Sequence, residues 1–294
     1  MKTRALLVAF CMLVAAAASA AEKPVIVVEG AQMPGWVEHA SGARDPLTIG
    51  ARLVNSDRII TGPGARALLR LADGSLIKLG ENGILALDDL GQKKIRMKDL
   101  VTASLDVVKG AFRFTTQALN KFRGERDIKV HIVTITAGIR GTDLWGKADD
   151  TRDIVCLIEG NVTVVRAEEA FTMKDPMSFY IAPKNKPGEP VARVSQQQLD
   201  IWSAETDIAA GKGAIRKGGK WRVYLAEVGS QDEALKVYDD LRKAGYAAEI
   251  RPAKKEEATT YRVRISNLTS KPEAEVLGAS LKGRFGITET RVSK

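Results

Sequence analysis

Chemically reactive side chains are scarce in this chain. Its 294 residues include two cysteines, Cys11 and Cys156, and two histidines, His39 and His131. Neither histidine stands at metal-ligand spacing with Cys, Asp or Glu, so the sequence offers no metal centre. Cys156, the one cysteine outside the apolar amino end, makes no pair of nucleophile and base with the dispersed histidines. We therefore expect a protein that is not an enzyme and that carries no cofactor.

Long apolar runs are also absent, except at the amino end. A basic start, residues 1–4, precedes fourteen apolar or small residues from Ala5 to Ala18, fewer than the ~20 that span a bilayer. Small residues then occupy the positions before Ala21. This pattern predicts a secretory signal peptide over residues 1–20, cleaved after Ala20. We expect an exported, periplasmic protein whose mature chain has no transmembrane segment.

Export would leave a single cysteine in an oxidising compartment. Cleavage removes Lys2 and Arg4 and lowers the formal net charge from +9 to +7. No internal disulfide can then form. Cys156 lies in the apolar run Ile154–Ile158, which predicts a buried, inert thiol. The positive excess suits an acidic partner at the cell envelope.

Residues 21–182 carry strand and turn signals almost throughout. Apolar residues alternate with polar ones in 68–71 and 76–79, around Asp73-Gly74, which predicts a hairpin with a type I′ turn. Residues 154–165, with Glu159-Gly160-Asn161 at their centre, predict a second hairpin. Short strands with glycine turns favour an all-β domain, either a β-sandwich or a short β-solenoid.

Several blocks of this region resemble the FecR-like periplasmic domain. The matching residues are Gly50-Ala51-Arg52-Leu53, Asp57, Ile60 to Ala67, Leu71 to Ser75, Ile139 to Leu144 and Glu159-Gly160-Asn161-Val162. The resemblance implies a β-rich extracytoplasmic module involved in sensing or protein contacts, and no activity. We interpret Arg140-Gly141-Thr142 as a turn or bulge, where glycine tolerates a positive φ.

Residues 183–220 are expected to connect two domains. Prolines between Pro183 and Pro190 mark the exit from the β domain. Ser195 begins a capping box, and Leu199, Trp202 and Ile208 predict a short amphipathic helix that packs on the β domain. The following segment, residues 211–220, is rich in glycine and lysine and is interpreted as a flexible linker.

Residues 221–294 contain an internal repeat with an offset of forty residues. Trp221-Arg222-Val223 falls on Tyr261-Arg262-Val263, and Glu233-Ala234 falls on Glu273-Ala274. Each half reads as strand, helix and strand, and the last strand is predicted over Ile287 to Val292. Two such halves predict an α+β, ferredoxin-like βαββαβ domain with both helices on one face of a four-stranded sheet.

This stretch resembles a SPOR domain, a cell-wall module of bacterial septal proteins. The matching residues are Val223 to Val228, Ala234, Ala244-Gly245-Tyr246 and Tyr261 to Leu268. Tyr224 stands where family members usually carry glutamine. The resemblance implies binding to peptidoglycan glycan strands that have lost their stem peptides.

The alternation of residues assigns a ligand-binding face to the predicted sheet. If the valines, leucine and isoleucine of the first and third strands face the helices, polar residues face the open side. The candidate glycan-binding residues are Arg222, Tyr224, Arg262, Arg264 and Ser266. A tyrosine ring offers a flat apolar partner for a sugar, and arginine donates paired hydrogen bonds to a carboxylate.

Two other classes of function fit parts of this pattern. Aromatic and arginine side chains on a four-stranded sheet also describe an RNA-recognition motif, but residues 261–268 lack its glycine–aromatic signature and export removes the protein from nucleic acid. The second alternative is a periplasmic sensor or scaffold. In that case the β domain binds an envelope protein, and wall binding only positions it.

Overall fold

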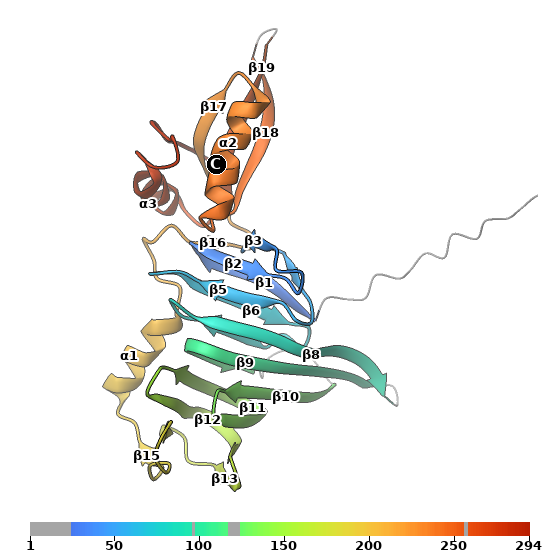
Figure 1. The fold of residues 1–294 in the computed structure, drawn as a ribbon, viewed down its shortest axis with the longest axis vertical. Coiled ribbons are helices and arrows are strands. Elements are labelled where there is room, and N and C mark those ends of the chain that lie inside the picture. Colours follow the sequence, from blue (N-terminus) through green and yellow to red (C-terminus); the bar gives the residue numbers. More distant parts are fainter. Residues whose placement is uncertain (1–24, 96–97, 117–123, 256–257) are drawn as a thin grey trace, which may run out of the picture.

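The computed structural model describes residues 25–95, 98–116, 124–255 and 258–294. The predicted signal peptide, residues 1–20, lies outside this part. Strands of the amino-terminal β domain stack along the long axis of the molecule, and the carboxy-terminal module stands at one end of the stack (Figure 1).

Strand pairings divide the β domain into two layers. The strands are β1 (Ile26–Gln32), β2 (Gly35–Glu38), β3 (Arg44–Pro46), β4 (Arg52–Leu53), β5 (Arg58–Thr61), β6 (Arg66–Leu71), β7 (Leu76–Leu79), β8 (Ile84–Ile95), β9 (Lys98–Thr115), β10 (Glu125–Ile132), β11 (Ile135–Ala148), β12 (Arg152–Arg166), β13 (Glu169–Met173), β14 (Ser178–Pro183) and β15 (Ala192–Arg193). The first layer runs β3–β2–β5–β8–β9–β10–β11–β12–β13, and the second runs β1–β6–β7–β9–β11–β12–β14–β15. Side chains from both layers form one buried hydrophobic core.

Three long strands, β9, β11 and β12, belong to both layers. Each passes from one layer to the other at a glycine with positive φ: Gly110 (+89°), Gly141 (+63°) and Gly160 (+92°). The bulge predicted at Gly141 is confirmed, because the β11–β12 register shifts between Arg140 and Asp143. The hairpin predicted over residues 154–165 is wrong. β12 continues through Gly160, since glycine permits a bend there without ending the strand.

The hairpin predicted around Asp73-Gly74 is present as β6–β7, with Arg70 opposite Leu76. Its turn is not type I′, because Gly74 has a positive φ (+87°) and Asp73 does not. The Asp73 carboxylate instead accepts hydrogen bonds from the backbone N–H and the hydroxyl of Ser75. This side-chain bonding stabilises a different turn.

Helix α1 (Gln196–Thr206) covers part of the outer surface of the second layer. Ser195 caps it as predicted, accepting a hydrogen bond from Gln198 N at 3.2 Å. Trp202 stacks on Trp145 of β11, with ring centroids 4.7 Å apart. Cys156 lies in this cluster, fully buried, and burial raises the pKa of its thiol to about 12. The thiol is therefore protonated and inert, as predicted.

The carboxy-terminal module has the element order strand, helix, strand, strand, helix, strand. These elements are β17 (Trp221–Val228), α2 (Gln231–Lys243), β18 (Ala248–Lys255), β19 (Ala258–Leu268), α3 (Lys271–Leu281) and β20 (Arg291–Ser293). The antiparallel strand order is β20–β17–β19–β18. Apolar residues of both helices pack on β17 and β19, so both helices cover one face. The last strand was predicted over residues 287–292. The observed strand, β20, is shorter and covers Arg291–Ser293.

The glycine-rich segment 211–220 is built into the fold and is not a flexible linker. Within it, β16 (Ile215–Arg216) pairs with β1 on one side and with Leu268 of β19 on the other. The buried carboxylate of Glu273 accepts the N–H groups of Gly211, Gly213 and Ala214 at 2.5, 2.6 and 3.1 Å. Paired backbone groups and a charge-assisted cluster hold this segment in one conformation.

A second set of contacts joins the two domains at the end of α2. Gly35 N donates to Gly245 O at 3.0 Å, and the Trp36 indole donates to Lys243 O at 3.1 Å. Gly245 has φ +82° and lies against the Trp36 ring, where any side chain would collide. The β domain therefore holds the module in a defined orientation.

Candidate functional site

One face of the carboxy-terminal sheet is free of helices. Val223, Leu225, Val263 and Ile265 are at most 1% exposed and pack toward α2 and α3. The alternate positions are partly exposed on the opposite face, as the sequence predicted. Those side chains are Arg222, Tyr224, Arg262, Arg264 and Ser266. We call this surface the open face.

A β-bulge at Leu225 changes which residues reach the open face. Tyr224 lies opposite Arg264, but the next paired residue of β17, Ala226, lies opposite the buried Val263. Glu227 is consequently opposite Arg262 on the open face. Strict alternation along β17 would place Ala226 there, so the sequence pattern alone does not identify Glu227.

Other strands add residues to the open face that were not predicted from the sequence. β20 brings Arg291 beside Tyr224 and Ser293 beside Arg222. β18 brings Glu249 opposite Arg264 and Arg251 opposite Arg262. Predicting these residues requires the register in which the edge strands pair with β17 and β19. The alternation of residues within one strand does not provide that register.

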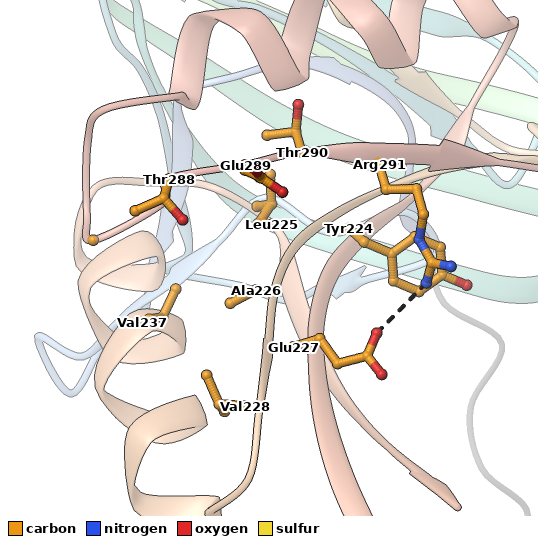
Figure 2. A pocket seen from close by; sticks show the side chains of 11 residues that line it. Tyr224, Leu225, Ala226, Glu227, Val228, Val237, Thr288, Glu289, Thr290 and Arg291 are labelled. Atoms are coloured by element: carbon orange, nitrogen blue, oxygen red, sulfur yellow. Dashed lines mark ion pairs between the residues drawn. The ribbon is translucent and has the colours of Figure 1, made fainter. Parts of the chain in front are cut away.

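Tyr224 lies at the centre of the open face between two arginines. The guanidinium carbon of Arg291 is 4.7 Å from the ring centroid, and that of Arg262 is 5.9 Å away. These contacts are cation–π interactions, in which the ring face attracts the positive charge. Figure 2 shows Arg291 lying over the Tyr224 ring and pairing with Glu227 at 3.6 Å.

Two glutamates hold the arginines of the open face in position. Glu227 accepts from Arg262 Nη2 at 3.2 Å, and this hydrogen bond lowers the pKa of Glu227. Glu249 pairs with Arg264 at 2.8 Å and also accepts from Ser266. Burial raises the pKa of Glu249, but the bonds from Ser266 and Arg264 outweigh it and the net shift is downward. Both glutamates are therefore ionised at neutral pH.

The open face carries a net positive charge. Its charged side chains are Arg222, Arg251, Arg262, Arg264, Arg291, Glu227 and Glu249. Five arginines against two glutamates leave three positive charges, which suit an anionic ligand. The same environment lowers the pKa of Tyr224 to about 8, chiefly through a hydrogen bond with Ser293 and further through Arg264 and Arg222.

A pocket of about 390 Å³ adjoins the open face, where β20 does not continue along β17. Tyr224, Glu227 and Arg291 line its rim. The side chains of Ala226, Val228 and Val237 face residues 288–290 across it (Figure 2). The last strand was predicted to begin at Ile287, but β20 begins at Arg291. Residues 287–290 therefore do not pair with β17, and this space stays open.

Within the ranges that the structure describes, no group of three or more His, Cys, Asp or Glu side chains could hold a metal ion. In the same ranges, no helix is both long and apolar enough to cross a membrane. The side chain of His131, on β10, forms a hydrogen bond between its Nδ1 and Thr136 Oγ1 at 3.0 Å.

Comparisons with known proteins identify two domains in this order along the chain. Residues 57–163 match the FecR protein family, and residues 217–292 match the SPOR domain. Both are non-catalytic families of binding or regulatory modules, typical of periplasmic or envelope proteins, and the SPOR domain indicates peptidoglycan binding.

Among solved structures, two of a proposed anti-sigma factor from Parabacteroides distasonis ATCC 8503 are similar to this chain. One is 16% identical, with 76% of this chain and 89% of that chain covered and a TM-score of 0.39. The other is 15% identical, with 81% and 98% covered and a TM-score of 0.38. No curated protein matches the chain.

Proposed function

We propose that this protein is an exported, non-catalytic peptidoglycan-binding protein whose open face binds glycan strands stripped of their stem peptides. The SPOR match over residues 217–292 and the ferredoxin-like strand order β20–β17–β19–β18 support this function. The observation that carries it is the position of Tyr224 in an arginine-rich, helix-free sheet face.

The chemistry of a peptide-free glycan strand is complementary to this face. Loss of the stem peptide exposes the lactyl carboxylate of each N-acetylmuramic acid residue. A tyrosine ring packs against the C–H face of a sugar, while neighbouring arginines donate to the carboxylate. Since Glu227 and Glu249 already orient Arg262 and Arg264, little side-chain entropy is lost when the strand binds.

The FecR-like domain acts in this proposal as an adaptor or sensor module. Its rigid junction with the wall-binding module, through β16 and Glu273, fixes where the β domain lies on a bound strand. Denuded strands arise where amidases remove stem peptides, so we place the protein at the division septum.

Sedimentation of the full chain with sacculi tests the proposed function. Amidase treatment, which removes stem peptides, is expected to increase the pelleted fraction several-fold. Arg264→Ala is expected to reduce that gain, because it removes an open-face cation; Arg193→Ala, an exposed arginine of β15, serves as the charge-matched control. Equal pelleting before and after amidase treatment would contradict glycan recognition.

Binding is also expected to weaken as pH rises from 7 to 9. Tyr224 is neutral below its pKa of about 8 and becomes a tyrosinate above it. The added negative charge lowers the positive balance of the open face and repels the lactyl carboxylates. Tyr224→Phe keeps the ring but cannot ionise, so its affinity should stay level over this range. A parallel decline in both proteins would exclude Tyr224 as the titrating group.

The FecR match over residues 57–163 favours a second candidate function, in which the β domain binds an envelope protein and wall binding only positions it. Localisation in cells separates the two. If a full-length Tyr224→Ala variant loses its septal focus, the open face directs the protein. If the focus persists, the β domain directs it.

A further inference from the structure

The pocket beside the open face exposes the unpaired backbone edge of a strand. β20 pairs with β17 only at residues 222–224. In the described part of the chain, no backbone hydrogen bond joins residues 225–228 to residues 286–290. Because the next segment turns away, this edge of β17 presents backbone N–H and C=O groups to the pocket.

The far wall of the pocket is fixed in place. Ile287 is 1% exposed and belongs to the hydrophobic core. Thr290 lies against Gly278 of α3, where an added Cβ would come within 2.9 Å of the threonine hydroxyl. Residues 287–290 therefore cannot close onto β17 without leaving the core, and the space is a built feature of the module.

The pocket wall combines two properties that suit one chemical group. Ala226, Val228 and Val237 supply small apolar side chains, and the β17 edge beside them supplies backbone hydrogen-bonding groups. An acetamido group has one N–H donor, one carbonyl acceptor and a methyl group. Glu227 and Glu289 line the pocket against one cation, Arg291, so its net charge is negative and disfavours a carboxylate there.

We propose that this pocket binds an N-acetylhexosamine residue of the glycan strand through its acetamido group. The inference rests on the proposed function and extends it, since it names the part of the ligand that reaches beyond the open face. Arg291 lines both surfaces, so the neighbouring sugar can place its lactyl carboxylate on the arginines while the acetamido group enters the pocket.

Two variants with the same substitution test this assignment in the full chain. Ala226→Leu fills the pocket and is expected to weaken binding to peptide-free strands about ten-fold, the value of one or two lost hydrogen bonds. Ala279→Leu, at an exposed position of α3, is the matched control and should bind as the unmodified chain does. Thermal unfolding of both variants verifies that the module remains folded.

A ligand series gives a test that needs no variant. Strands are de-N-acetylated and then re-acylated with either an acetyl or a trimethylacetyl group, so both products carry a neutral amide. Restored binding for the acetyl product alone supports the pocket. Equal binding of both products, or an undiminished affinity of Ala226→Leu, overturns it. Failure of the unmodified chain to bind any strand overturns glycan binding itself, which is a distinguishable result.

Discussion

Replacing Glu273 by alanine is expected to lower the free energy of unfolding by about 4 kcal/mol. The buried carboxylate accepts the N–H groups of Gly211, Gly213 and Ala214. Gly213 and Ala214 are buried, so their N–H groups would lose this partner in a place that water reaches poorly, whereas Gly211 is exposed. Unsatisfied buried donors cost about 1–3 kcal/mol each, and the losses at two neighbouring donors are not fully additive. The apparent Tm should fall by roughly 10 °C.

Glu275→Ala is the matched control for this substitution. Glu275 is on the same helix, but its side chain is 53% exposed and pairs with the exposed Lys271 at 3.4 Å. Exposed pairs contribute less than about 1 kcal/mol, so the control should unfold close to the unmodified chain. Amide hydrogen exchange at Gly213 and Ala214 should accelerate in Glu273→Ala alone. Equal Tm values for the two variants would show that Glu273 does not stabilise the junction.

The role of Glu273 also shows why the junction was not predictable from composition. Residues 211–220 have the glycine and lysine content of a flexible linker. What holds them is a carboxylate that follows sixty residues later in the chain, at the first turn of α3. The repeat that aligns Glu233 with Glu273 identifies a helix start in both halves. It does not indicate that only one of the two glutamates is buried against a neighbouring segment.

The two layers of the β domain were only partly predictable for a related reason. Alternation identifies individual strands correctly, as in β6 and β7. A glycine between two apolar runs gives the same sequence pattern in a hairpin turn, where the chain reverses, and in a bend within one continuous strand. At Gly160 the chain bends and the strand continues into the other layer, because β11 accompanies it on both sides of the glycine. Pairing with a partner strand decides the outcome, and the local sequence does not encode it.

In the candidate site too, the residues that follow from local alternation were predicted, and those that depend on pairing between strands were not. The residues predicted on β17 and β19 lie on the open face, since a period of two follows directly from strand geometry. Glu227 was missed because one extra residue at Leu225 reverses that period. Glu249 and Arg291 were missed because their positions depend on register across strands. Two of the missed residues, Glu227 and Glu249, hold the predicted arginines Arg262 and Arg264 in place.

Replacing Tyr224 by alanine is expected to weaken binding to peptide-free glycan strands roughly thirty-fold, equivalent to about 2 kcal/mol. The ring supplies the aromatic surface of the open face, and its loss removes the apolar contact with the sugar. It also removes the surface over which Arg262 and Arg291 lie. Both arginines would then lose part of the geometry in which they meet a carboxylate.

Tyr224→Phe separates the ring from the hydroxyl and provides the control at pH 7. It keeps both cation–π contacts and loses the hydrogen bonds that the hydroxyl shares with Ser293, Arg264 and Arg222. Its affinity should remain within a few-fold of the unmodified chain, because the proposed sugar contact uses the ring face. Isothermal titration with soluble peptide-free strands measures both variants. If alanine and phenylalanine weaken binding equally, the hydroxyl contacts the ligand and the stacked geometry is wrong; if neither does, the glycan lies elsewhere.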